Sequence, residues 1–406
     1  MIGNRKLADV LIPIKMPTNL NFSNTEIAFS GKSNADLNRA YWLFKAISSN
    51  LLVKIGPPIT TFAMAIGLPV APIIRATIFR HFCGGESIDS CNTTIEQLAK
   101  FNIGTILDYS VEGAENESSF DATMQETIAT IARAKGDSKI AFGVFKVTGL
   151  ARFALLEKMD AGQSLSPAEQ AEYDRVSNRI YQICKAAYDA KVRIFIDAEE
   201  SWIQNSIDEL SYQMMAHFNK QEAVVFNTYQ FYRHDRLAAM KTAHQKLKAA
   251  GLFFGIKLVR GAYMEKERAR AAEKKYLDPI QPNKNASDAD YDAALTYCVE
   301  NIADISICAG THNEKSSMHL VNLMTQHQIA KNDRRIYFSQ LLGMSDNLSF
   351  NLSMAGYNVA KYVPYGPVKK VLPYLFRRAE ENTAIAGQMG RELSLIVTEQ
   401  QRRKGN

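Results

Sequence analysis

Cysteine is scarce in this chain, and its few copies form no pattern. They are odd in number and widely spaced, no two of them stand in a CxxC arrangement, and no histidine-rich segment accompanies them. This distribution argues against a disulfide framework and against a zinc site, so we expect no bound metal. It is typical of a protein kept in a reducing compartment. The five cysteines are Cys83, Cys91, Cys184, Cys298 and Cys308.

A large excess of either charge is also missing. Lysine and arginine number 48 against 42 acidic residues, the net charge is +6, and the only short basic run is Arg402–Lys404. Such a scattered distribution predicts no nucleic-acid partner. The opening segment Met1–Lys6 leads into polar sequence without the apolar core and small-residue cleavage site of a signal peptide, so we expect a cytoplasmic protein.

One long stretch, Ile55–Ile74, lacks charge altogether and has about the length that spans a bilayer. Four prolines stand in it, and they would interrupt a spanning helix and leave carbonyl groups unpaired in hydrocarbon. We therefore expect this stretch to pack against the rest of the protein, with shallow, peripheral contact with a membrane as the alternative. The prolines are Pro57, Pro58, Pro69 and Pro72.

The glycine string G-x-G-x-x-G, which usually marks a dinucleotide site in an open doubly wound sheet, occurs nowhere in the chain. After about residue 103, short β-rich runs alternate with stretches of helical period, and eight such units predict a closed α/β fold, a (β/α)8 TIM-type barrel over 103–406. Residues 1–102 are mixed helical and rich in Pro and Gly, and we interpret them as a helical extension that docks on the barrel. The eight predicted strands are Gly104–Asp108, Ile140–Val147, Val192–Asp197, Ala223–Tyr229, Phe254–Val259, Ile305–Ala309, Arg335–Gln340 and Val359–Val363.

Functional residues of a barrel lie at the C-terminal ends of its strands, and most of the predicted strands end in polar groups. Lys146 ends an otherwise apolar strand, where a buried lysine is costly unless it is paired. Asp197 leaves the core in the same way, although capping of the next helix would also explain it. Thr311–Asn313 suits either a capping turn or a ligand contact, and a lone histidine there leaves both open. Lys257–Tyr263 combines cations with a Gly-Ala pair that lets backbone approach a flat or anionic ligand.

The last helix of the barrel carries the strongest single pattern. Tyr374, Arg377, Arg378 and Glu381 follow one another at i, i+3, i+4 and i+7, which places them on one face. From periodicity alone, a surface helix with Arg–Glu pairs in water is the favoured interpretation. Two adjacent guanidinium groups, however, suit bidentate binding of a carboxylate.

These strings together resemble the proline dehydrogenase family, and the resemblance extends over nearly the whole chain. It is carried by Asp197–Glu200, Lys257–Tyr263, Thr311–Asn313, Gln340–Met344, Tyr362–Pro367 and Pro373–Asn382, with Asn24–Phe29 and Gly84–Glu86 near the start. The resemblance implies a distorted (β/α)8 barrel that binds FAD non-covalently at its mouth. It also implies oxidation of L-proline to Δ1-pyrroline-5-carboxylate by hydride transfer, with electrons passed to a membrane quinone.

The same resemblance implies roles for individual residues. Lys257 falls near the reactive nitrogen of the flavin, where many bacterial members carry arginine, so this chain departs from them. Asp197 matches a strand-end aspartate of the family and is a candidate acceptor for the amine proton. The substrate positions are Lys146, Arg377 and Arg378 for the carboxylate, Leu341, Tyr362 and Tyr374 for the pocket walls, and Glu381 for the helix carboxylate. The cofactor positions are Ile196, Gln230, Lys257, Val259, Arg260, Gly261, Ala262, Thr311, His312 and Asn313.

Three alternatives stay open at this point. Hydroxyproline oxidation is the nearest, although the phenol of Tyr362 would crowd a ring hydroxyl. A Schiff-base aldolase that uses Lys146 is more remote. A non-catalytic membrane-docked scaffold would depend on Ile55–Ile74 alone.

Overall fold

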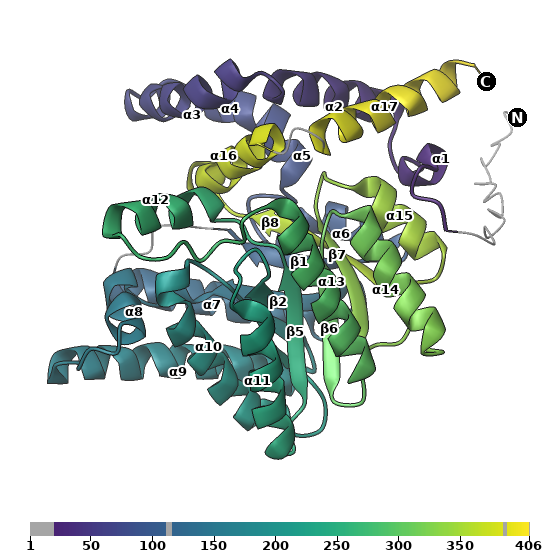
Figure 1. Cartoon of the computed structure of the whole chain (residues 1–406). Helices are drawn as coiled ribbons and strands as arrows, with labels where there is room; N and C mark the ends of the chain where they lie inside the picture. The colour runs from purple at the N-terminus through teal and green to yellow at the C-terminus, as the bar shows by residue number, and fades with distance from the viewer. Residues whose placement is uncertain (1–19, 111–115, 385–387, 406) are drawn as a thin grey trace, which may run out of the picture.

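Eight parallel strands close into a barrel in the order in which they occur along the chain (Figure 1). The computed structural model describes residues 20–110, 116–384 and 388–405, without the side chains of 50–53, 64–65, 380–384 and 388–389. The segment Met1–Lys6, on which the localisation prediction depends, lies outside the described residues. The strands are β1 (Ile103–Tyr109), β2 (Ile140–Lys146), β3 (Arg193–Asp197), β4 (Val225–Gln230), β5 (Phe254–Val259), β6 (Ile305–Gly310), β7 (Ile336–Leu341) and β8 (Val359–Tyr365). The predicted (β/α)8 barrel is confirmed.

The interior of the barrel is a packed aromatic core at its lower end. The rings of Phe142 and Phe195 stack with centroids 4.3 Å apart, and Phe226 and Tyr337 meet Phe142 edge-on. The guanidinium group of Arg193 lies over the rings of Phe142 and Tyr337. Below the C-terminal ends of the strands the barrel is therefore filled by side chains, as in other closed eight-stranded barrels.

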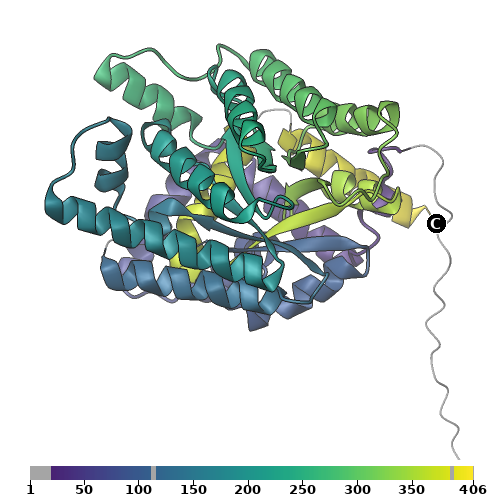
Figure 2. The ribbon, with the colours of Figure 1, turned by 90° about the horizontal axis from the view of Figure 1, so that it is seen from below.

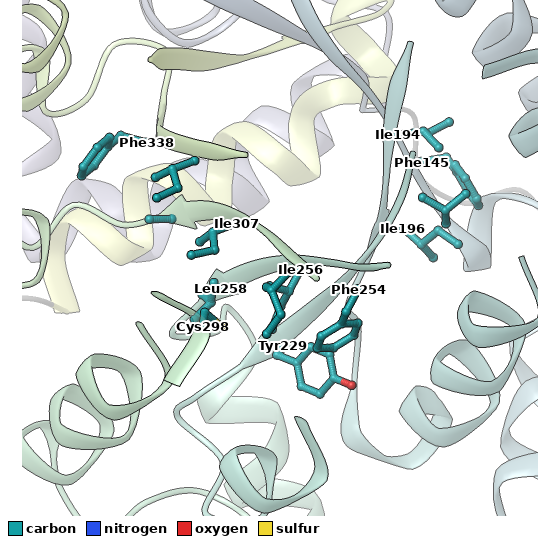
Figure 3. Close-up of a cluster of buried hydrophobic side chains, with 14 of the residues drawn as sticks. Phe145, Ile194, Ile196, Tyr229, Phe254, Ile256, Leu258, Cys298, Ile307 and Phe338 are labelled. Carbon is teal, nitrogen blue, oxygen red and sulfur yellow. The ribbon is translucent and has the colours of Figure 1, made fainter. Parts of the chain in front are cut away.

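The outward faces of the strands pack against a ring of helices (Figures 1 and 2). Figure 3 shows part of this layer, with Ile194 and Ile196 of β3 on one side and Ile256 and Leu258 of β5 on another. Both faces of each strand are thus buried, which explains why the strands read as short continuous apolar runs. The helices of the ring are α7 (Glu117–Ala134), α8 (Phe153–Asp160), α9 (Pro167–Ala190), α10 (Ser201–Phe218), α11 (Arg236–Ala249), α12 (Met264–Lys274), α13 (Lys284–Glu300), α14 (Glu314–Gln326) and α15 (Asp346–Met354).

Local signals in the sequence set the ends of several helices. Ser166 caps α9 in a reciprocal capping box with Glu169, and Pro167 occupies the first turn, where its missing N–H costs nothing. Gly136 and Gly251 follow α7 and α11 with φ of 73° and 70°, as the expected left-handed caps require.

The N-terminal helices lie against the last two helices of the chain, above the strands in the view of Figure 1. Leu37, Phe44 and Phe82 share an apolar cluster with Val371 and Leu375, which belong to the helix after β8. We interpret residues 20–102 as an extension docked on the barrel. The N-terminal elements of this layer are α1 (Thr25–Ala28), α2 (Asn34–Ile47), α3 (Asn50–Ala65), α4 (Ala71–Ile74), the π-turn η1 (Arg75–Phe79) and α5 (Arg80–Phe82), and the last two helices are α16 (Val368–Ala384) and α17 (Gln388–Lys404). Helix α6 (Asn92–Ala99) packs on β1 instead.

The charge-free stretch Ile55–Ile74 differs from its prediction in two ways. Helix α3 runs through Pro57 and Pro58 without ending, and the residues around them are exposed or half-exposed, so water can bond the carbonyl groups that the prolines leave unpaired. Most of its large apolar side chains do not pack inward: Phe62 is 66% exposed and Ile73 also 66%, whereas Ile74 is buried. The expectation that this stretch packs against the protein was therefore wrong for most of its bulky side chains. Within the described residues no helix combines the length and apolarity needed to cross a bilayer.

Candidate active site

Three polar side chains from three strands meet inside the mouth of the barrel. The ammonium group of Lys257 on β5 forms an ion pair with Asp197 at the end of β3, and it donates to the hydroxyl oxygen of Tyr362 on β8 over 2.6 Å. The Tyr362 hydroxyl lies 3.2 Å from Oδ1 of Asp197. Burial, and then the nearby carboxylate of Asp197, raise the pKa of Tyr362 well above its usual value, so the phenol stays protonated. All three were predicted site residues, and the fold brings them together.

Lys146 and a second carboxyl group border this cluster. Strand register pairs Lys146 of β2 with Asp197 of β3, so their side chains project from the same level of the barrel. Asp108 is the last residue but one of β1, and its carboxylate accepts a hydrogen bond from the Ser110 hydroxyl over 2.6 Å. Burial raises the pKa of Asp108, and the charge of Lys146 opposes that rise. The sequence analysis missed Asp108 as a site residue, although it ends the predicted strand Gly104–Asp108 just as Asp197 ends Val192–Asp197.

The predicted pocket walls come from two apolar clusters that share one residue. Leu341 packs both on the barrel interior, where Tyr362 lies, and on the cluster that contains Tyr374 of α16. The guanidinium carbon of Arg378 lies 5.3 Å from the centre of the Tyr374 ring, in a cation–π contact.

Helix α16 is therefore not a solvated surface helix. Tyr374 is 5% exposed and Arg378 is 7% exposed, which makes the interpretation favoured by periodicity alone wrong for both. Arg377 on the same face is half-buried. The side chain of Glu381 lies outside the described residues. Periodicity could not reveal this burial, because α16 packs against α2, α3, α4 and η1, which lie far away in the sequence.

The side chain of Arg260 is held by hydrogen bonds to other residues of the protein. Its guanidinium group binds Asp288 over 2.6 Å and donates to the hydroxyl groups of Thr311 and Ser316, each over 2.9 Å. Asn313 caps α14 through its side-chain oxygen, which accepts from two backbone N–H groups. These hydrogen bonds hold the loop after β6 in place.

The other predicted cofactor positions have few polar side-chain groups, so a ligand would contact mainly their backbone atoms. The side chain of Ile196 points outward into the helix layer (Figure 3), and Gln230 donates to the Glu199 carbonyl oxygen over 2.6 Å. Gly261 and Ala262 are exposed at the end of β5, next to half-buried Val259. Gly261 has φ of 138°, and a Cβ there would lie 2.4 Å from the Tyr232 ring, so only glycine fits.

A buried polar group lies behind the loop that follows β7, and the sequence analysis did not find it. Lys361 is fully buried on the outer side of β8, where it pairs with Asp346 over 2.9 Å and donates to the carbonyl oxygens of Leu341 and Met344. The ring of His81 contacts the carbonyl oxygen of Gly343 over 2.9 Å. These bonds fix the backbone that carries Leu341. The sequence pattern does not reveal these bonds, because both faces of β8 are buried and no alternation of polar and apolar residues marks Lys361.

The fold and the site together define a (β/α)8-barrel protein whose mouth is lined by cations, carboxyl groups and aromatic rings. Across the part of the chain that the structure describes, no cluster of His, Cys, Asp and Glu residues could hold a metal ion. The family model for proline dehydrogenase matches residues 91–391, well over half of the chain. The chain belongs to the proline dehydrogenase family.

Named relatives agree with this assignment. Proline dehydrogenase 1, mitochondrial, of Drosophila melanogaster is 39% identical over 249 residues, which are 59% of this chain and 37% of the fly protein. The carbapenem antibiotics biosynthesis protein CarD of Pectobacterium carotovorum subsp. carotovorum is 32% identical over 79% of this chain and 83% of its own length. Hydroxyproline dehydrogenase of Xenopus laevis is 36% identical over 61% of this chain and 54% of its own length. The chain thus spans little more than a third of the fly relative.

Solved structures support the fold. Proline utilization A from Bdellovibrio bacteriovorus, inactivated by N-propargylglycine, superposes with a TM-score of 0.70 over 88% of this chain and 38% of that chain. The sequence identity is 19%, so this likeness concerns the fold alone.

Proposed function

We propose that this protein oxidises L-proline to Δ1-pyrroline-5-carboxylate with FAD bound at the barrel mouth, and that the electrons pass to a quinone. The observation that carries the proposal is the enclosure of Tyr374 and Arg378 over a mouth that already holds Asp197, Lys257 and Tyr362. A small zwitterion with a carboxylate and a compact ring matches such a combination of cations and aromatic walls. Membership of the proline dehydrogenase family supports the same substrate.

The residues present fit a flavin. A flat polar ring system needs an apolar wall, fixed donors at its edges and backbone that can come close. Thr228, paired with Lys257 across β4 and β5, has a buried hydroxyl group with no hydrogen-bond partner among the described residues. The exposed backbone of Gly261 and Ala262 offers the close approach. FAD, when bound, would supply the acceptor for the two electrons of amine oxidation.

The chain's own residues would bind and orient the substrate. Lys146, Arg377 and Arg378 would hold its carboxylate and thereby fix the ring carbon next to nitrogen in a single position. Leu341, Tyr362 and Tyr374 would exclude water and limit the ring size that the pocket accepts.

We assign Asp197 as the acceptor of the amine proton. Both bonds described for this carboxylate, from Lys257 and from Tyr362, go to Oδ1. We therefore assign Oδ2 as the oxygen that takes the proton. Lys257 stays close enough to balance negative charge as it develops in the mouth.

The visible spectrum of the purified protein tests the proposal. We expect a flavin spectrum as purified or after reconstitution with FAD, and bleaching of its main band when L-proline is added without oxygen. A protein that binds no flavin, or a flavin that L-proline leaves oxidised, would overturn the proposal. The Schiff-base aldolase alternative is not retained, because the chain belongs to a family of dehydrogenases.

Comparison of L-proline with trans-4-hydroxy-L-proline in the same assay tests ring selectivity. Tyr362 supports proline, because its phenol is held rigidly by Lys257 and would crowd a ring hydroxyl. Faster bleaching by hydroxyproline would instead assign the activity that the Xenopus relative carries in its name.

We further propose that α3, α4 and the segment between them contact a lipid surface, where a quinone would be met. Most of their exposed side chains are apolar, with the exposed cations Lys54 within α3 and Arg75 just after α4, which pairs with Glu86, as in helices that lie at an interface with anionic lipid. Helix α3 also packs on α16, which places this surface next to the proposed substrate clamp. The predicted cytoplasmic location stays a prediction. The surface consists of Ile55, Ile59, Phe62, Ile66, Leu68 and Ile73.

A further inference from the structure

A tight turn follows β7 and carries Leu341, which we place in the wall of the proposed pocket. The N–H of Met344 donates to the carbonyl oxygen of Leu341 over 3.2 Å, and Gly343 at the third position has φ of 76°, as a type II turn requires. The N–H of Leu342 donates to the carbonyl oxygen of Tyr362 over 2.8 Å. These residues, 341–344, form the β7 turn, and its backbone sets where Leu341 lies relative to Tyr362.

Lys361 holds both ends of the β7 turn from the neighbouring strand β8. The three N–H donors of its ammonium group meet the carboxylate of Asp346 over 2.9 Å, the carbonyl oxygen of Leu341 over 3.3 Å and the carbonyl oxygen of Met344. The side chain is fully buried. All three donors of Lys361 are thus used, two of them on the β7 turn.

Stability alone does not explain a lysine at this place. A buried ion pair can often be replaced by apolar side chains of similar volume without loss of stability. The positions on either side of it on the same face of β8, Val359 and Val363, are apolar and belong to the core under the helices. A lysine that interrupts this apolar row and bonds the backbone of one turn points to a role in placing that turn.

His81 holds the middle of the same turn from the N-terminal extension. Nε2 of its ring lies 2.9 Å from the carbonyl oxygen of Gly343, and it donates, because a carbonyl oxygen can only accept. The rings of Phe44 and Phe82 meet the imidazole edge-on, with centroids 5.2 Å and 4.7 Å away. A Cβ at Gly343 would lie 2.5 Å from the carbonyl oxygen of His81, so the two segments approach as closely as only glycine allows. Lys361 and His81 thus bind the β7 turn from two segments far apart in the chain.

The position of Leu341 decides how much room the proposed pocket offers. Its side chain is half-buried, and it packs on the apolar cluster of the barrel interior with Tyr362 and on that of α16 with Tyr374. A small displacement of Leu341 would widen the space between those two clusters. Because one methylene group in an apolar pocket changes selectivity by about 10- to 200-fold, such a displacement changes which ring the pocket accepts.

We propose that Lys361 and His81 are positioning residues that hold Leu341 against the proposed pocket and thereby make it selective for a five-membered ring. That this ring is proline rests on the proposed function. The hold of the two residues on the β7 turn does not.

Binding of two acids that differ by one methylene group tests the selectivity. Cyclopentanecarboxylate and cyclohexanecarboxylate carry the carboxylate of the proposed substrate but lack its ring nitrogen, so they bind without being oxidised. Titration calorimetry on the full chain, reconstituted with FAD, gives the ratio of their dissociation constants. For the wild type we expect the smaller acid to bind at least about tenfold more tightly.

Paired variants at Lys361 separate position from charge. Lys361→Met/Asp346→Asn removes the hold on the turn without leaving a charged carboxylate unpaired, and we expect the ratio to fall below about threefold. Asp346→Asn alone removes the same charge, but its side-chain oxygen still accepts from Lys361, so the ratio should stay at the wild-type value.

His81 offers a second test in which a conservative variant rescues the first. His81→Phe keeps an aromatic ring against Phe44 and Phe82 but removes the donor, and the ratio should fall about threefold. His81→Gln places an amide N–H near the position of Nε2 and should restore the ratio to within about a factor of two of the wild type.

Amide hydrogen exchange followed by mass spectrometry reports on the turn without any ligand. In Lys361→Met/Asp346→Asn we expect the peptide that contains the β7 turn to exchange at least about fivefold faster, whereas the peptide of β5 should exchange as in the wild type. Faster exchange throughout the barrel would show that Lys361 stabilises the fold as a whole, and it would overturn the proposal. A wild-type ratio of dissociation constants in the double variant would overturn it as well.

The outcomes distinguish the proposal from the proposed function. A wild type that oxidises L-proline, together with a double variant that keeps the wild-type ratio, would overturn the positioning roles alone. A wild type whose flavin L-proline leaves oxidised, together with a ratio that falls in the double variant, would overturn the proposed substrate and leave the positioning roles standing.

Discussion

The ammonium group of Lys257 lies 2.6 Å from the hydroxyl oxygen of Tyr362 while it is paired with Asp197. This relationship joins β3, β5 and β8 inside the barrel, at the level where the resemblance to proline dehydrogenases places substrate and cofactor. The cluster therefore serves both the stability of the barrel and the proposed chemistry.

Removal of the cation should destabilise the barrel. Lys257→Met leaves the carboxylate of Asp197 buried without its partner, and we expect a loss of about 3 kcal/mol in the free energy of unfolding. The double variant Asp197→Asn/Lys257→Met should lose less than the sum of the single variants, because the unpaired charge is gone. Urea unfolding followed by tryptophan fluorescence measures all three, and strict additivity would show that the two groups do not interact.

Loss of one guanidinium group should weaken substrate binding without loss of the cofactor. In Arg377→Met we expect the KM for L-proline to rise at least about tenfold, because a charge-assisted bond to the carboxylate is lost, while the FAD content stays unchanged. Lys370→Met is the matched control, since it removes an exposed cation from the same helix. A KM within a factor of two of wild type for Arg377→Met would remove this residue from the proposed clamp.

Acidic substitutions on the exposed apolar surface should abolish lipid binding. Ile59→Asp/Phe62→Asp adds two charges to α3, where both side chains are more than half exposed, so the fold should be retained. We expect the wild type to co-sediment with vesicles of phosphatidylcholine and phosphatidylserine and the double variant to stay in the supernatant. Leu277→Asp, at a site that is 80% exposed elsewhere on the molecule, should bind as wild type. Equal binding by all three proteins would exclude α3 as the contact.

Stability should fall as the pH rises from about 4.5 to 7. Burial raises the pKa of Glu199 from 4.5 to about 7, so within this window the folded state holds a proton that the unfolded state has released. The shift corresponds to at most about 3 kcal/mol, fully lost above pH 7. Glu199→Gln should reduce the difference in urea stability between pH 5 and pH 8, whereas Glu273→Gln, whose side chain is 70% exposed, should not. An unchanged difference in Glu199→Gln would contradict the raised pKa.

The barrel could be predicted because its strands are buried on both faces. Apolar and β-branched runs at a regular spacing mark such strands, and the predicted strand Phe254–Val259 has the bounds of β5. Helix α15 could not be found in this way, because its buried positions include Asn347, Ser349 and Asn351. Those polar side chains bond to backbone and side chains elsewhere in the fold, so the helix shows no apolar stripe.

Several site residues could be predicted from their places in the predicted strands. The way in which their side chains pack could not. Asp197 ends β3, whereas Lys257 and Tyr362 lie within β5 and β8, and the three side chains meet inside the barrel. The burial of Arg378, the exposure of Phe62 and the role of Lys361 depend on contacts between segments far apart in the chain. No local pattern in the sequence encodes such contacts.

The aromatic floor of the barrel has a kinetic consequence. Phe142, Phe195 and Phe226 are fully buried beneath the polar cluster, so nothing can pass through the barrel from its N-terminal end. Under the proposed function, the amine donor and the electron acceptor would therefore both reach the flavin from the C-terminal mouth, and we propose that they bind there in turn. Turnover would alternate between two half-reactions, and initial rates measured against both reactants should give the parallel reciprocal plots of a ping-pong cycle.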